Sequence, residues 1–193
     1  LEKDGKKIFP EILEYLKPGC GFGGSCFPKD IKALSSLAKE TSIKPNIIDS
    51  VIAVNDGQPN SIIRMLEDKV KDLSNKRILI LGLSFKPETD DVRESVSIKL
   101  INLLNKKVLS ISAHDPIAIE NAKKSINTSV NINYIDDWKA ELYEADIIII
   151  ATNWSIYKSI NKLTNSLSKK VIFDTRSLLD SSKFNAKNYL SVD

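Results

Sequence analysis

The sequence predicts an α/β protein in which a helical segment precedes a doubly wound parallel sheet. Two observations support this fold class. Up to about residue 75, apolar side chains recur at the three- and four-residue spacing of helices. From residue 76 onward, short continuous apolar runs alternate with helical patterns, as in βαβ units. We therefore expect two domains, 1–75 and 76–193.

The first segment is expected to hold two shorter helices, a glycine-rich loop and one long helix. Residues 9–16 have a helical pattern, and four glycines stand within six positions of the loop 18–28. A helix follows at 30–39, where Asp30 suits the positive end of the helix dipole. The long helix covers 46–73, with a bend expected near Gly57 to Pro59. A helix of this length in a small protein often serves as a spacer or as an oligomer contact.

The second segment contains apolar runs that are typical of strands buried on both faces of a parallel sheet. These strands are expected at 78–81, 108–111, 147–151 and 171–173, with a weaker candidate at 131–135. Helical patterns separate them at 95–104, 117–125 and 160–167. In such a sheet the ligand crevice lies at the carboxyl ends of the strands.

Composition excludes several classes of function. The chain has 193 residues, 42% of them hydrophobic, which is enough for one core and a smaller helical unit. With 27% charged residues and a net charge of +3, it has no strong field of one sign, so nucleic acid is not expected as a partner. It has no apolar run of membrane-spanning length and a charged start, so we expect a cytoplasmic protein. The opening without methionine suggests a piece of a longer chain.

The chain has two cysteines and a single histidine, too few for a disulfide framework or a zinc site. Cys26 stands between the glycine loop and a helix start, where amide dipoles favour a thiolate that could attack a carbonyl carbon. The alternative is a small buried apolar cysteine, which is the expected role of Cys20. We expect His114 to be a polar loop residue, and Trp138 and Trp154 to serve packing.

The turn after the first strand of the sheet, residues 82–95, lacks the G-x-G-x-x-G pattern of a dinucleotide site. It carries Lys86 and Arg93 beside a helix start, an arrangement that could hold phosphate or pyrophosphate. The alternative is that both cations pair with the acidic side chains of the same turn, Asp90, Asp91 and Glu94.

Residues 21–30, Gly-Phe-Gly-Gly-Ser-Cys-Phe-Pro-Lys-Asp, resemble the active-site signature of the UDP-glucose/GDP-mannose dehydrogenase family. Further matching segments follow in the right order at 54–58, 82–86, 89–95, 114–116 and 174–176, with His114 in place of the more usual tyrosine. The resemblance covers essentially the whole chain. It implies the end of a central, dimerising helical domain followed by a Rossmann-like nucleotide-sugar domain.

The resemblance implies an NAD-dependent oxidoreductase that oxidises a nucleotide sugar twice, UDP-glucose to UDP-glucuronate being the favoured reaction. Cys26 would be the nucleophile that forms a thiohemiacetal and then a thioester, and Asp30 would support proton transfer and water positioning. Residues of the family that contact the substrate match Tyr15, Leu16, Lys17, Pro18, Gly19, Phe22, Gly23, Phe85, Lys86 and Arg176. Lys29 and Arg93 match positions that contact NAD.

Alternatives remain within and outside this reaction. The segment Ser25 to Pro28 favours UDP-glucose, with GDP-mannose and UDP-N-acetylmannosamine as competing substrates. A catalytic Lys and Asn and the NAD-binding domain of the family would precede Leu1, so the chain alone is expected to be inactive and to need that domain as its partner. A homodimer through the long helix is expected, although Lys6 and Lys7 stand where the family has an arginine that crosses the dimer interface. From another class, the chain could be a non-catalytic nucleotide-sugar binding or dimerisation module.

Overall fold

A computed structural model describes residues 2–3, 6–7 and 18–192. The helix expected at 9–16 and the expected contacts from Tyr15, Leu16 and Lys17 lie outside the described residues. At the start of the chain, β1 (Glu2–Lys3) and β2 (Lys6–Lys7) pair in antiparallel fashion.

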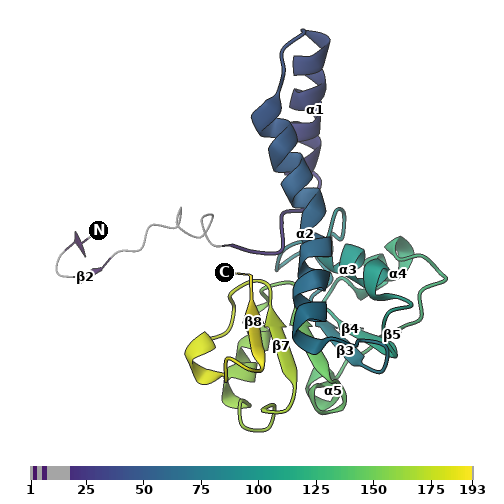
Figure 1. Cartoon of the computed structure of the whole chain (residues 1–193), viewed down its shortest axis with the longest axis vertical. Helices are drawn as coiled ribbons and strands as arrows, with labels where there is room; N and C mark the ends of the chain where they lie inside the picture. The colour runs from purple at the N-terminus through teal and green to yellow at the C-terminus, as the bar shows by residue number, and fades with distance from the viewer. Residues whose placement is uncertain (1, 4–5, 8–17, 193) are drawn as a thin grey trace.

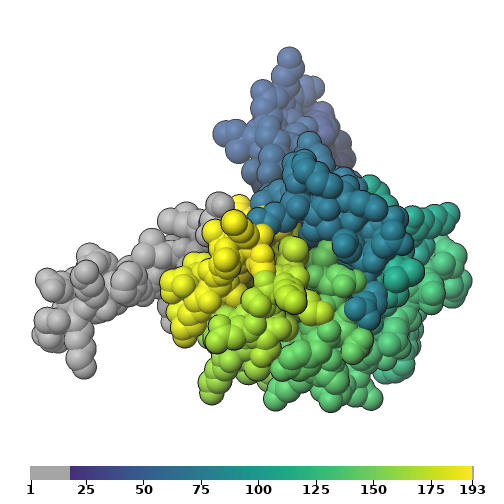
Figure 2. Space-filling view, turned by 60° about the horizontal axis from the view of Figure 1, so that its bottom comes forward, coloured from purple at the N-terminus to yellow at the C-terminus, as the bar shows by residue number. Residues whose placement is uncertain are grey.

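Two helices form a hairpin, of which α1 and the amino-terminal half of α2 stand away from the body of the molecule (Figures 1 and 2). α1 (Phe27–Glu40) begins after Cys26 and carries Asp30 in its first turn, as predicted. α2 (Asn46–Val70) runs through Pro59 and ends three residues before the predicted boundary. Asp49 ties the two helices together, since its carboxylate accepts a hydrogen bond from the Ser35 hydroxyl at 2.5 Å and pairs with Lys39 at 3.0 Å.

The rest of the chain forms a six-stranded sheet in which every neighbouring pair is parallel. Its strands are β3 (Arg77–Leu81), β4 (Ser110–His114), β5 (Ile132–Tyr134), β6 (Ile147–Ile150), β7 (Val171–Asp174) and β8 (Tyr189–Ser191). The order β5-β4-β3-β6-β7-β8 is that of a doubly wound Rossmann fold, because the chain winds outward from β3 and then crosses back to β6. The predicted α/β fold class is confirmed.

Alternating strand residues bury two separate cores, one on each face of the sheet. In β3, Ile78 and Ile80 face one core, while Leu79 and Leu81 face the other. The first core is covered by the carboxyl half of α2 with α3 (Val96–Leu104) and α4 (Ile119–Ser125). The second is covered by α5 (Trp138–Glu144) and the 3-10 helix η2 (Ser155–Lys162). Each fully buried Leu or Ile contributes about 1.5–3 kcal/mol, so these cores fix the strand ends that carry the site.

Several predicted boundaries were wrong. The helix expected at 160–167 is instead η2, because the buried side chains Tyr157 and Ile160 follow the three-residue period of a 3-10 helix. β4 begins two residues later and ends three residues later than predicted. Neither α5 nor β8 was predicted, since both are short, and α5 is fixed by the Asp137 side chain, which accepts hydrogen bonds from two backbone amides of its first turn.

His114 is a buried strand residue and not the polar loop residue that the sequence suggested. It ends β4, is only 7% exposed and lies 2.9 Å, at its Nδ1 atom, from the Tyr157 hydroxyl. The ring of Trp138 contacts Tyr157 edge-on and, with Trp154, is part of the second core, as expected for both tryptophans. Because β4 extends three residues beyond its predicted end, His114 lies in this aromatic cluster and not in a solvent-exposed loop.

The stability of the chain is expected to fall when the pH drops below about 6.5, the ordinary pKa of histidine. Burial lowers the pKa of His114, with Asp115 and Asp136 opposing it to a lesser extent. The folded state therefore binds a proton at His114 less well than the unfolded chain does. The protein keeps its full stability above the pKa of His114 in the unfolded chain, and loses stability as the pH falls from there toward the lower pKa of the folded state. Thermal unfolding at pH 7.5 and pH 5 measures this loss. His114→Phe should show a smaller drop, and an unchanged drop would contradict the assignment.

Candidate functional site

The glycine loop lies across the carboxyl ends of β6 and β7, next to the switch point of the sheet between β3 and β6. The Cys20 amide donates to the Thr175 carbonyl at 3.2 Å. The Arg176 guanidinium donates to the Ala151 carbonyl at 2.9 Å and to the Gly21 carbonyl at 3.3 Å. Arg176 therefore connects the loop to both strand ends. This position is the ligand crevice that a doubly wound sheet offers.

The loop also meets the turn that follows β3, and glycines permit the approach. The Gly24 amide donates to the Arg93 carbonyl at 2.9 Å. Gly24 has a φ of +86°, and a methyl group there would come within 2.8 Å of the Phe85 ring. A side chain on Gly23 would run into the backbone carbonyl of Glu94. The structure thus brings Gly23 and Gly24 of the loop together with Phe85 of the turn, whereas Gly19 lies beside Thr175 and Phe22 beside Phe27.

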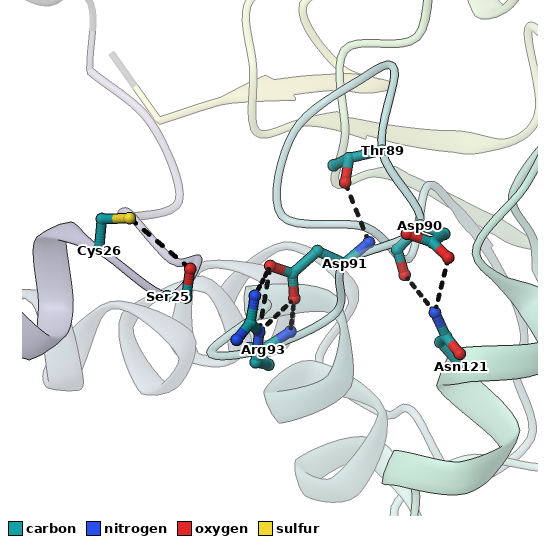
Figure 3. Close-up of polar contacts among 7 residues, drawn as sticks. All are labelled: Ser25, Cys26, Thr89, Asp90, Asp91, Arg93 and Asn121. Atoms are coloured by element: carbon teal, nitrogen blue, oxygen red, sulfur yellow. Dashed lines mark hydrogen bonds and ion pairs between the residues drawn. The ribbon is translucent and has the colours of Figure 1, made fainter.

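Cys20 is fully buried, whereas Cys26 is exposed at the amino-terminal cap of α1 (Figure 3). Its sulfur lies 3.7 Å from the Ser25 hydroxyl. The amide of Asp30 donates to the Cys26 carbonyl at 2.9 Å, so the Asp30 side chain stands one helical turn from the thiol on the same face. The buried, apolar alternative therefore holds for Cys20 and does not hold for Cys26.

A pocket of about 600 Å³ opens beside Cys26. Its lining contains three cationic side chains, Lys29, Lys32 and Arg93, and one carboxylate, Glu94. The remaining lining residues are Gly24, Ser25 and Pro28. Lys29 pairs with the neighbouring Asp30 at 3.4 Å, and both side chains are largely exposed. Lys32 was not predicted, although its place one turn after Lys29 on the same helix could have suggested it. Positive charge at a helix start fits the pyrophosphate of a dinucleotide.

Arg93 and Lys86 behave differently, so the ion-pair alternative is confirmed for one of them. Both carboxylate oxygens of Asp91 accept hydrogen bonds from the Arg93 guanidinium, the shortest being 2.7 Å between Nη2 and Oδ2 (Figure 3). This pairing raises the pKa of Arg93, with a smaller contribution from Cys26, and lowers the pKa of Asp91. Lys86 lies over the Phe85 ring at 5.4 Å and, among the residues that the structure describes, has no ion pair.

The other two acidic residues considered for this turn, Asp90 and Glu94, pair with residues outside it. Asp90 accepts hydrogen bonds from the Asn121 amide through its carbonyl and its carboxylate, both at 3.0 Å. Glu94 pairs with Lys99 at 2.7 Å and with Lys32 at 3.6 Å, and these two lysines lower its pKa. These polar contacts fix the turn, and Arg93 lies at the edge of the pocket.

Asp115 is a further residue that fixes the turn after β3, and the sequence did not single it out for that role. It is 2% exposed. Its Oδ2 accepts hydrogen bonds from the amides of Leu83 and Ser84, the Ser84 hydroxyl and the Trp154 indole, at 2.7 to 3.2 Å. Its Oδ1 accepts two more from the backbone amides of Ile117 and Ala118. The carboxylate thus joins the chain segments that follow β3, β4 and β6.

Residues 79–181 match the model of the UDP binding domain of the UDP-glucose/GDP-mannose dehydrogenase family, and residues 5–57 match its central domain. The chain belongs to this family. The Cys26 loop lies within the central-domain match and contacts the UDP-binding-domain match through the carbonyls of Thr175 and Arg93.

Individual relatives agree with this family. The chain is 40% identical over 169 residues to a UDP-glucose 6-dehydrogenase of Rickettsia conorii, covering 86% of the chain and 39% of the relative. It is similar to the structure of a UDP-glucose dehydrogenase from Pyrobaculum islandicum, with a TM-score of 0.79, 34% identity, and coverage of 90% of this chain and 38% of that one. A GDP-mannose dehydrogenase of Pseudomonas aeruginosa shares the fold at a TM-score of 0.72 and 24% identity, covering 92% and 41%. The chain thus spans about two fifths of the length of these relatives.

Within the described ranges no cluster of His, Cys, Asp and Glu could hold a metal ion. In the same part of the chain, no helix combines the length and apolar character needed to cross a membrane.

Proposed function

We propose that this chain forms the nucleotide-sugar half of an NAD-dependent UDP-glucose 6-dehydrogenase, with Cys26 as its nucleophile. The observation that supports this best is the exposed Cys26 at a helix cap, beside a pocket with three cations and next to the switch point of the sheet. Family membership supplies the reaction class. The two domains of the proposal meet near residue 75, after α2.

In the proposed reaction the primary alcohol of the sugar is first oxidised to an aldehyde. The Cys26 thiolate adds to the aldehyde carbon to form a thiohemiacetal, loss of a second hydride gives a thioester, and water cleaves it to the carboxylate and the free thiol. Asp30, one turn from Cys26, accepts and returns the protons and orients the water. NAD, when bound, accepts a hydride at each oxidation. The covalent adduct keeps the aldehyde in place between the two steps.

The glycine loop and the strand ends would bind the nucleotide sugar. In the proposal Pro18, Gly19, Phe22 and Gly23 line it from one side, Phe85 and Lys86 from the other, and Arg176 binds its nucleotide end. Arg176 already holds the loop against the end of β6, so it stands where a nucleotide would enter the crevice. Tyr15, Leu16 and Lys17 are proposed to extend the same loop.

Lys29 and Arg93 are proposed to bind the pyrophosphate of NAD, with Lys32 as a third cation. The pocket of about 600 Å³ beside Cys26 has room for such a group, and its charge suits it. The remainder of the cofactor site would come from an amino-terminal NAD-binding domain. Both cysteines are free, which is compatible with the cytoplasm, where we place the protein.

We also propose that the hairpin of α1 and α2 forms a homodimer contact. Large apolar side chains are exposed along it, among them Leu34, Leu37, Ile43, Ile47, Val51 and Val54. Ile47 is 81% exposed, and a patch of this kind marks a surface that another protein covers. A monomeric mass of the full-length gene product in sedimentation would reject this contact.

The proposed reaction is tested by incubating the full-length gene product with NAD and one nucleotide sugar at a time. UDP-glucose should give two NADH per sugar and a stable UDP-glucuronate product. Faster NADH formation with GDP-mannose or UDP-N-acetylmannosamine would reassign the substrate. Absence of NADH with all three sugars would favour a non-catalytic nucleotide-sugar module.

A further inference from the structure

One side chain of α2 binds the backbone of the glycine loop directly. The Phe22 amide donates to the Asn55 side-chain oxygen at 2.8 Å, and the Asn55 side-chain nitrogen donates to the Phe22 carbonyl at 3.2 Å. Both polar backbone groups of one loop residue are therefore paired with a single half-buried side chain. A bidentate contact of this kind fixes the orientation of the peptide as well as its position.

The neighbouring glycine is matched to this contact. Gly21 has a φ of +101°, and a methyl group added to it would lie 2.7 Å from the Asn55 oxygen. A glycine at this position is thus needed both for the backbone conformation and for the approach of Asn55. The Asn55 side chain and Gly21 form one unit.

The contact between Asn55 and Phe22 can influence the position of Cys26. Phe22 lies four residues before Cys26 and contacts α1, the helix whose amino-terminal cap is Cys26. The Phe22 ring meets the ring of Phe27, the first residue of α1, edge-on at a centroid distance of 4.6 Å. Elsewhere the loop is anchored by the backbone carbonyls of Thr175 and Arg93 and by the Arg176 guanidinium, which donates to the Gly21 carbonyl. Replacing Asn55 would leave those anchors in place and release the segment nearest to Phe27.

We propose that Asn55 is a positioning residue that holds the loop so that Cys26 faces the substrate. The expected effect on catalysis rests on the proposed function, whereas the contact between Asn55 and Phe22 does not depend on that function. A displacement of about 1 Å at a reacting group can reduce turnover roughly 10²-fold. Asn55 should therefore influence the turnover number more than the overall stability.

The test compares Asn55→Ala with Asn60→Ala, an exposed asparagine on the same helix, and with Asn55→Asp, which keeps an acceptor for the Phe22 amide. Hydrogen exchange of the Phe22 amide is measured by NMR in this chain, and kcat and KM for UDP-glucose in the full-length gene product. In Asn55→Ala the Phe22 amide should exchange about tenfold faster or more, and kcat should fall about 10- to 100-fold. Asn60→Ala should change neither, and Asn55→Asp should recover the amide protection and part of kcat.

Gly21→Ala provides an independent variant, because it displaces the loop from an intact Asn55 and should give the same two effects. Unchanged Phe22 exchange in Asn55→Ala would overturn the proposal, and so would faster exchange with an unchanged kcat. If the wild-type protein oxidises no nucleotide sugar, the proposed function fails. The exchange data would then still decide whether Asn55 holds the loop.

Discussion

Asp115→Asn is expected to lower the free energy of unfolding by about 3–5 kcal/mol, a large part of the total for a domain of this size. The buried carboxylate accepts six hydrogen bonds, all of them from N–H or O–H donors. An asparagine side chain has only one acceptor oxygen. Whichever way the amide is turned, its NH₂ group would face backbone amides that then lose their partner.

The measurement is urea unfolding of the wild type, Asp115→Asn and the control Asp136→Asn. Asp136 is exposed and lies on the next loop of the same edge of the sheet, so its replacement should change stability by no more than about 0.5 kcal/mol. A loss below about 1 kcal/mol for Asp115→Asn would contradict the role of this carboxylate in joining β3, β4 and β6.

Cys26→Ala is expected to lower NADH formation by the full-length gene product at least about 10³-fold, because the second cysteine of this chain, Cys20, is buried and cannot form the covalent intermediate in its place. Without the thiol, the reaction could proceed at most to the aldehyde. Any residual turnover should therefore yield about one NADH per sugar in place of two. Absorbance at 340 nm with product analysis by mass spectrometry measures both quantities.

Cys20→Ala is the matched control for this change. Cys20 is fully buried with its sulfur 3.9 Å from the Ala151 carbonyl, so its replacement should cost some stability and leave the two-step stoichiometry intact. Turnover within tenfold of the wild type in Cys26→Ala, with two NADH per sugar, would remove Cys26 from the mechanism.

The parts of the site that the sequence predicted are those with local signals. Cys26 stands between four glycines and a helical pattern, so its place at a helix cap followed from neighbouring residues. Lys86 and Arg93 follow an apolar strand, and strand ends in a parallel sheet open onto the crevice. The apolar runs likewise predicted β3, β6 and β7, because burial on both faces leaves no polar alternation.

The parts that the sequence did not predict depend on contacts between distant segments. Asn55 and Phe22 are 33 positions apart, and Asp115 and Trp154 are 39 apart, with no periodic pattern linking either pair. His114 was misassigned because the predicted strand ended at 111, three residues too early. A shift of that size moves a residue from the end of a buried strand into a solvent loop, and hence reverses the inferred environment.

The central claim, a nucleotide-sugar site at the carboxyl ends of β6 and β7, is tested most directly by isothermal titration of this chain with UDP-glucose, UDP and GDP-mannose. Arg176→Ala probes the site, and Arg77→Ala is the control, since Arg77 pairs with Asp146 and Glu144 at the opposite end of β3. We predict that UDP-glucose and UDP bind the wild type, that GDP-mannose binds more weakly, and that Arg176→Ala weakens UDP binding about tenfold or more while Arg77→Ala does not. UDP binding that is equally strong in Arg176→Ala, or that is lost equally in Arg77→Ala, would contradict the placement of the site.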